Sequence, residues 1–379
     1  MKVGIPKEIV LDERRVALVP EAVGTVVKAG TEVHVEVGAG EGAFIPDRAF
    51  EEAGATLVPD ARALLSQAEV VLKVQAPALN TALGAHEVEM MREGAVLITF
   101  LQPQSDPDLV KRLAERKITS FSMDYIPRIA RAQKMDALSS QSTVAGYKAV
   151  LIAASSLGKF VPMLVTAAGT VPPAKVLILG AGVAGLQAIA TARRLGAMVQ
   201  AYDIRPAVKE QIESLGGSFL AFDLVGEQTE DAGGYARELT GESQEREKVL
   251  LGRHVPQADI VITTALIPGR RAPILITGEM VQEMKTGSVI VDLAAEMGGN
   301  CELTEPGRTV TKHGVIIHGQ LNLPSTMPFH ASQMYSRNIS SLLLHLVQEY
   351  LKSPAPPGAQ RHARARFQRP DHERYLRHA

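Results

Sequence analysis

Three glycines in the middle of the chain have the spacing of a dinucleotide-binding turn. The apolar run Lys175–Leu179 leads into Gly180, Gly182 and Gly185, a G-x-G-x-x-G motif that opens a helical pattern. The first glycine permits a tight turn, the second lets the backbone approach a pyrophosphate, and the third lets helix and strand pack closely. N–H groups at the start of the helix, from Val183 on, then bind the phosphates.

An acidic residue follows the next apolar run. Met198–Tyr202 ends at Asp203, where a carboxylate binds the adenosine ribose hydroxyls and repels a 2′-phosphate. The motif therefore predicts NAD(H) rather than NADP(H). Arg205 weakens this preference, since a nearby arginine accommodates the phosphate, but it precedes Pro206 and we expect it to point away. Alternatively, Asp203 is the N-cap of a helix starting at Pro206, a role compatible with ribose binding.

A polar segment, Pro127–Ser142, falls where two domains would join. Ligand clefts form at such junctions. Arg128, Gln133, Asp136 and Ser139 can together bind an amide and a ribose without titrating at neutral pH. The spacing alone leaves two interpretations open, a cofactor clamp and a plain interdomain linker.

The histidines do not suggest acid–base catalysis. A dehydrogenase that oxidises an alcohol or amine moves a proton as well as a hydride and usually employs a histidine. The ten histidines here are scattered along the chain. On an extended strand His313 and His318 would face opposite sides, so they do not form a metal pair. We expect no metal site.

Length and composition restrict the class of protein. With 379 residues the chain exceeds one hydrophobic core, which favours two domains. The formal net charge of −1 predicts no nucleic-acid partner. Cys301 is the single cysteine, so an internal disulfide is excluded. The longest apolar region, Ala149–Pro172, is interrupted by polar residues, prolines and glycines, so we expect no transmembrane segment.

The elements that must position these residues form two series of alternating strands and helices, which predicts an α/β protein with two doubly wound Rossmann-like domains and a cleft between them. A helix at Met334–Leu351 carries an apolar stripe and is expected to return to the first domain. The predicted domains are 1–138 with 325–352, the nucleotide-binding domain 139–324, and a flexible basic tail 353–379. That tail is a frayed terminus or a docking arm for a partner or acidic membrane. The long polar loop from about Asp223 to Gly234 is a functional flap or disordered.

With these features, the chain resembles the NAD(H)-binding domain I of proton-translocating nicotinamide nucleotide transhydrogenase. The resemblance runs from Lys2–Glu8 to about Leu351 and rests on the glycine motif with its helix, the Arg128–Gln141 segment, and the loop sequence Ala232–Ala236. In that family a mobile-loop tyrosine, here Tyr235, closes over the nucleotide.

The resemblance implies direct hydride transfer between NADH on this chain and NADP(H) on a separate domain III, with a membrane domain II coupling transfer to proton translocation. It implies that Arg128 and Asp136 hold the nicotinamide and its ribose beside Ser139, while Gln133 reaches toward the partner's nucleotide. It also implies a homodimer without a span of its own, located in the cytoplasm on the inner face of the plasma membrane through its partners. The further expected cofactor contacts are Ile204, Gly234, Ala265 and Leu266.

Alanine dehydrogenase shares the two-domain fold and is the alternative. Arg15 and Lys73 fall where that enzyme binds its carboxylate substrate, but its catalytic histidine would fall at Gln102. Without that histidine the proton shuttle is lost, so Arg15 and Lys73 are expected to be buried ion-pair members. A third possibility is a non-catalytic NAD-sensing module, which hydride transfer to a partner's NADP would exclude.

Overall fold

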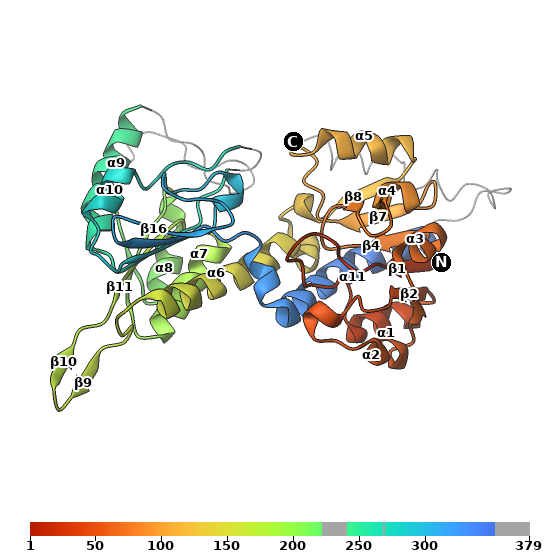
Figure 1. Ribbon diagram of the computed structural model, residues 1–379, viewed down its shortest axis with the longest axis horizontal. Coiled ribbons are helices and arrows are strands. Elements are labelled where there is room, and N and C mark those ends of the chain that lie inside the picture. The colour runs from red at the N-terminus through yellow and green to blue at the C-terminus, as the bar shows by residue number, and fades with distance from the viewer. Residues whose placement is uncertain (222–240, 268–269, 353–379) are drawn as a thin grey trace. The chain divides into compact units, whose positions relative to one another are not determined.

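The structure is a computed structural model that describes residues 1–221, 241–267 and 270–352 (Figure 1). The chain divides into two compact units. Unit 1 contains Met1–Gln141 together with the described residues from Ser325 onward, and unit 2 contains Ser142–Pro324. Among the described residues, no helix combines the length and apolar character needed to cross a bilayer.

Unit 1 is built on a parallel six-stranded sheet in the order β3-β2-β1-β4-β7-β8. Its short, valine-rich strands are buried because helices cover both faces, as a doubly wound sheet requires. The strands are β1 (Lys2–Ile5), β2 (Glu32–Glu36), β3 (Thr56–Val58), β4 (Val70–Leu72), β7 (Val96–Thr99) and β8 (Thr119–Ser122), with the small hairpin β5 (Leu79–Asn80) and β6 (Ala85–His86). The helices are α1 (Pro20–Lys28), α2 (Asp47–Glu52), α3 (Ala61–Gln67), α4 (Glu87–Met90), α5 (Pro107–Glu115) and α11 (Pro328–Lys352).

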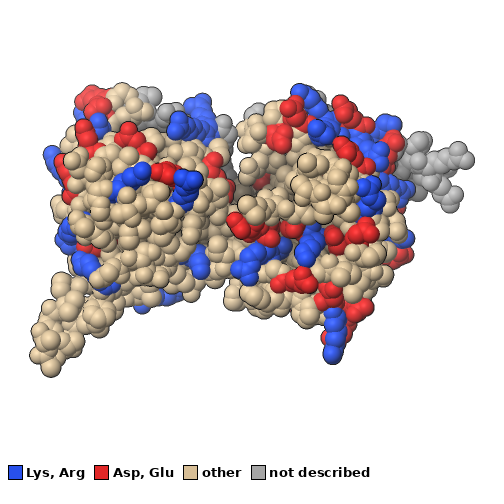
Figure 2. Space-filling model, viewed as in Figure 1, with Lys and Arg blue, Asp and Glu red and all other residues tan. Residues whose placement is uncertain are grey.

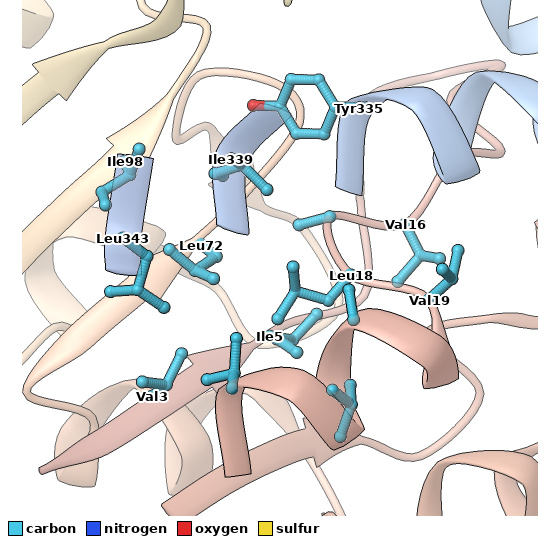
Figure 3. Close-up of a cluster of buried hydrophobic side chains, with 14 of the residues drawn as sticks. Val3, Ile5, Val16, Leu18, Val19, Leu72, Ile98, Tyr335, Ile339 and Leu343 are labelled. Atoms are coloured by element: carbon cyan, nitrogen blue, oxygen red, sulfur yellow. The ribbon is translucent and has the colours of Figure 1, made fainter. Parts of the chain in front are cut away.

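The last helix, α11, completes the core of unit 1, as its apolar stripe predicts. Tyr335, Ile339 and Leu343 are buried in one cluster with Ile5 and Leu72 (Figure 3). The Tyr335 hydroxyl donates a hydrogen bond to the Lys73 carbonyl at 2.7 Å. The helix begins at Pro328, ahead of the predicted start at Met334, since proline is favourable in the first turn of a helix.

Unit 2 contains a seven-stranded sheet in the order β13-β12-β11-β14-β15-β17-β16. All neighbours pair in parallel except β16, which joins β17 as an antiparallel hairpin. The strands are β11 (Lys175–Leu179), β12 (Met198–Tyr202), β13 (Ser218–Phe219), β14 (Ile260–Thr263), β15 (Val289–Asp292), β16 (Thr309–Lys312) and β17 (Val315–His318). The helices are α6 (Ala137–Ser156), which begins in unit 1, α7 (Val183–Arg194), α8 (Lys209–Ser214), α9 (Glu242–His254) and α10 (Gly278–Glu283).

A two-stranded hairpin extends from unit 2, away from its sheet (Figure 1). It consists of β9 (Leu164–Thr166) and β10 (Gly169–Val171). Val165 is 76% exposed, and Phe160 and Met163 beside it are more than half exposed. Figure 2 shows the hairpin without charged side chains.

Both sheets therefore have the strand order of the doubly wound α/β fold, and the predicted fold class is confirmed. In each sheet the order reverses between two central strands, β1 and β4 in unit 1, β11 and β14 in unit 2. Ligands of such sheets bind beyond the carboxyl ends of the strands at this reversal. The glycine motif of unit 2 lies at that point, directly after β11.

Candidate functional site

Two glycines of the motif allow strand β11 to turn tightly into helix α7. Gly180 has a φ of +97°, and a Cβ there would lie 2.5 Å from the Thr264 hydroxyl. A Cβ on Gly185 would lie 1.9 Å from the Gly180 carbonyl oxygen, closer than any side chain can approach. These positions meet the steric demands that the sequence predicts for the first and third glycines.

The second glycine faces open space. Gly182 is the N-cap of α7, and a Cβ on it would have no protein atom within 4 Å among the described residues. No side chain caps the helix, which starts at Val183. Backbone N–H groups and the positive end of the helix dipole are therefore presented where a pyrophosphate would bind. The residues present fit the phosphates of a dinucleotide.

Asp203 lies at the carboxyl end of β12 and is almost fully buried. Its Oδ2 accepts a hydrogen bond from the Ala181 N–H at 2.7 Å, which ties it to the glycine turn. Its Oδ1 accepts one from the Arg205 N–H at 2.9 Å. The helical turn after it, Pro206–Val208, has Arg205 as its N-cap and no side-chain cap, so the alternative interpretation of Asp203 as that cap is wrong.

The expectation that Arg205 points away is also wrong. Its guanidinium donates from Nε to Asp203 Oδ1 at 2.9 Å and from Nη2 to Oδ2 at 2.8 Å. A two-residue separation is short enough for the arginine to fold back onto the carboxylate. This bidentate geometry is the strong form of an arginine–carboxylate pair.

The loop after β14 forms the other side of the reversal. The Thr264 hydroxyl donates to the Gly180 carbonyl at 2.9 Å, which joins this loop to the glycine turn. Asn300 is fully buried and holds Ala265 from both sides. Its Oδ1 accepts from the Ala265 N–H at 3.0 Å, and its Nδ2 donates to the Ala265 carbonyl at 2.9 Å.

A buried carboxylate supports this asparagine. Asp292, at the end of β15, is fully buried and accepts hydrogen bonds on both oxygens. The donors are the Thr263 and Thr304 hydroxyls and the N–H groups of Ala294, Asn300 and Cys301. The sequence analysis does not identify Asp292, Asn300 or Thr264. The available signal is a set of polar residues directly following predicted strands, where parallel sheets place their functional groups.

The remaining predicted contacts of unit 2 differ in how they are placed. Ile204 is half-buried and packs against the hydrophobic core beside Leu179 and Tyr202. Leu266 is 45% exposed. Gly234 and Tyr235, together with the predicted flap, lie outside the described residues, as does the tail 353–379.

The polar segment of unit 1 is a helical turn followed by a helix. Ala130–Met135 forms a 3₁₀ helix, on which Gln133 is exposed. Asp136 then accepts from the Ser139 N–H at 2.9 Å and from the Ser139 hydroxyl at 2.5 Å, which stabilises the start of α6. Arg128 is exposed just before the turn. The structure thus brings Asp136 and Ser139 into contact and places Arg128 and Gln133 on the same short segment.

The reversal point of unit 1 is filled by charged side chains. Lys73 is fully buried, with Nζ 3.1 Å from Glu8 Oε2 and 2.9 Å from Glu87 Oε1. Burial alone would lower the pKa of Lys73, but the two carboxylates outweigh it and raise the pKa. Burial raises the pKa of Glu8.

A second buried cation of unit 1 is paired as well. Arg15 Nη2 lies 2.6 Å from Glu13 Oε2, and Arg15 Nη1 donates to Gln141 Oε1 at 2.8 Å. Burial acts to raise the pKa of Glu13, but the Arg15 hydrogen bond and charge outweigh it and hold the pKa at about 2. The prediction that Arg15 and Lys73 are buried ion-pair members is confirmed.

Gln102 has an exposed side chain and a left-handed backbone, with a φ of +46°. Asp124 Oδ2 accepts hydrogen bonds from the N–H groups of Leu101 and Gln102, at 2.8 and 2.6 Å. These bonds hold the backbone in a conformation that non-glycine residues rarely adopt. An amide side chain has no titration in the range that proton transfer needs, so this position offers no general acid or base.

Comparison with known proteins places the chain in a family. The models of the alanine dehydrogenase/PNT N-terminal and C-terminal domains match residues 4–145 and 149–355. The chain is 51% identical to the first of the separately encoded pieces of the NAD(P) transhydrogenase alpha subunit of Rhodospirillum rubrum, over 93% of this chain and 92% of that one. It is 33% identical to alanine dehydrogenase 2 of Staphylococcus aureus, over 86% and 82% of the two chains.

Solved structures agree. The crystal structure of a transhydrogenase from Sinorhizobium meliloti superposes with a TM-score of 0.81 at 44% identity, covering 92% of this chain and 95% of that one. An L-alanine dehydrogenase superposes with a TM-score of 0.77 at 31% identity, covering 93% and 91%. The chain belongs to the alanine dehydrogenase/PNT family.

Proposed function

We propose that this chain is the NAD(H)-binding subunit of a proton-translocating transhydrogenase. The observation that carries the proposal is the glycine turn, in which Gly182 leaves the start of α7 open to a pyrophosphate while Gly180 and Gly185 shape the turn. When bound, NADH supplies a hydride from its nicotinamide C4, which passes directly to NADP⁺ held by a partner subunit. The higher identity to a transhydrogenase subunit than to an alanine dehydrogenase supports this assignment.

Two features of unit 1 argue against alanine dehydrogenase chemistry. Gln102 stands where that enzyme would place its histidine, and an amide cannot accept the amine or alcohol proton. Lys73 is enclosed by Glu8 and Glu87 with no exposed surface, so a substrate carboxylate would have to displace a buried ion pair. Direct transfer between two nicotinamides moves no substrate proton and needs no such histidine. Its rate depends on positioning.

The polar segment of unit 1 supplies the proposed positioning residues. Asp136 is held by Ser139 and has acceptor capacity left for a ribose hydroxyl or a carboxamide N–H. Arg128 donates hydrogen bonds to the nicotinamide portion, and the exposed Gln133 contacts the partner's NADP(H). Gln133→Asn is expected to slow transfer with unchanged NADH affinity. A large loss of NADH affinity would instead assign Gln133 to the NAD(H) contacts.

The proposed partners are the NADP(H)-binding domain III, the membrane domain II and a second copy of this chain. Through domain II the protein would be located at the inner face of the plasma membrane. The exposed apolar side chains of the β9–β10 hairpin support the homodimer, because uncharged apolar surface marks protein contacts. Val165→Glu should yield monomers in light scattering, whereas Val249→Glu, at an exposed valine of α9, should leave dimers. Dimers in both variants would remove the hairpin from the interface.

The functional test is to mix the purified chain with the NADP(H)-binding subunit of a relative. NADH oxidation should begin only when both proteins and an NADP analogue are present. The chain alone should neither oxidise NADH with pyruvate and ammonia nor reduce NAD⁺ with alanine. Alanine turnover at ordinary enzyme rates by the chain alone would overturn the proposal.

A further inference from the structure

The carboxylate of Asp203 is already fully used within the protein. It accepts four hydrogen bonds, two on each oxygen, which is the usual acceptor capacity of a carboxylate. Three of the four donors belong to Arg205, namely its N–H, Nε and Nη2. The fourth is the N–H of Ala181 in the glycine turn.

The charge at this position is accordingly that of a pair rather than of an isolated aspartate. The Asp203 side chain is 5% exposed and that of Arg205 14% exposed, so solvent screens their attraction little. The guanidinium offsets the negative charge that a 2′-phosphate would meet. Repulsion by Asp203 is then too weak an explanation for preferring a ribose hydroxyl to a phosphate.

We propose that Arg205 is a specificity-determining residue, and that Asp203 selects NAD(H) chiefly by keeping Arg205 engaged. This inference rests on the proposed function, in that the glycine turn binds a dinucleotide. An arginine at the end of this strand is the group that accommodates a 2′-phosphate in NADP(H)-binding sites. To serve that purpose here, Arg205 would have to leave Asp203 buried and unpaired, which is strongly unfavourable.

A neutral replacement of Asp203 should therefore reverse the preference. In Asp203→Asn the side-chain oxygen can still accept from Ala181, so the glycine turn keeps its bond. The amide cannot form the bidentate ion pair, which leaves the guanidinium available for a phosphate. The site would then take dinucleotides that carry a 2′-phosphate, with Arg205 as the phosphate ligand.

The test is a double-mutant cycle on the full chain, with dissociation constants for NADH and NADPH measured by fluorescence titration. Asp203→Asn should bind NADPH at least about tenfold more tightly than the wild type and NADH more weakly, since tenfold corresponds to one new charge-assisted hydrogen bond. Adding Arg205→Gln to that variant should abolish the gain for NADPH. Adenosine 2′-phosphate should compete for Asp203→Asn and not for the double variant.

Two results would overturn the inference. One is unchanged NADPH affinity in a folded Asp203→Asn protein, and the other is an equal gain in the double variant, which would assign discrimination to the charge of Asp203 alone. If Asp203→Asn does not fold, Arg205→Gln alone decides, because the ratio of the NADPH to the NADH dissociation constant must rise when Asp203 loses its counter-charge. A ratio that stays constant contradicts the proposal. Failure of the wild type to bind NADH would contradict the proposed function instead.

Discussion

Replacing Gly182 by alanine separates dinucleotide binding from folding. The backbone there has φ −73° and ψ −167°, a region open to alanine, and the added Cβ meets no described protein atom within 4 Å. Alanine is a slightly poorer N-cap than glycine but restricts the unfolded chain, so the free energy of unfolding should change by less than about 1 kcal/mol.

Binding should suffer far more. The methyl group occupies the space through which a pyrophosphate approaches the N–H groups of α7. Losing one hydrogen bond to a charged group costs about 1.5–3 kcal/mol, which corresponds to a roughly 10- to 150-fold higher dissociation constant for NADH. Titration of NADH fluorescence measures this loss, and urea unfolding measures the stability.

Two further glycines are matched controls. Gly158→Ala also places a Cβ with no described neighbour within 4 Å, but away from the glycine turn, so it should change neither binding nor stability appreciably. Gly185→Ala places a Cβ 1.9 Å from the Gly180 oxygen and should destabilise unit 2. Wild-type NADH affinity in Gly182→Ala would refute the assignment of this turn to a pyrophosphate.

Two more predictions concern the buried charges of unit 1. Lys73→Met leaves Glu8 and Glu87 without their cation and should lower the free energy of unfolding by about 3–5 kcal/mol in urea. Lys111→Met removes an equally short but exposed pair with Asp108 and should cost less than about 1 kcal/mol; similar losses in both variants would contradict the role of burial. Because the pKa of Glu13 is held at about 2 against 4.5, its contribution, about 3 kcal/mol, is present above pH 4.5 and lost as the pH falls toward 2. Glu13→Gln should be less stable at neutral pH and flatter across that acid range in circular-dichroism melts, and an unchanged acid profile would exclude this role.

Much of the architecture can be predicted because the strands are buried on both faces. Strands such as Lys175–Leu179 and Met198–Tyr202 read as largely apolar runs, and their predicted bounds match the observed ones. The edge strand β16 alternates polar and apolar residues over only four positions and is absent from the sequence prediction. Its turn, His313-Gly314, has positive φ at both residues, and a glycine at this place is a hairpin signal that the sequence does contain.

The site is predictable to the extent that each residue acts through the backbone. Gly180, Gly182 and Gly185 have steric roles that follow from their spacing. Whether Arg205 turns toward Asp203 depends on side-chain torsions that no spacing rule specifies. The clamp of Asn300 on Ala265 joins residues far apart in the sequence and becomes visible only in the fold.

The central claim is direct hydride transfer from NADH on this chain to NADP⁺ on a partner. Its most direct test uses NADH deuterated at the transferred C4 position, mixed in ordinary water with this chain and an NADP⁺-loaded partner subunit. Mass spectrometry of the product should find one deuterium in each NADPH formed. NADPH that carries solvent hydrogen instead, or no NADPH at all with both proteins folded and NADH bound, would contradict the account.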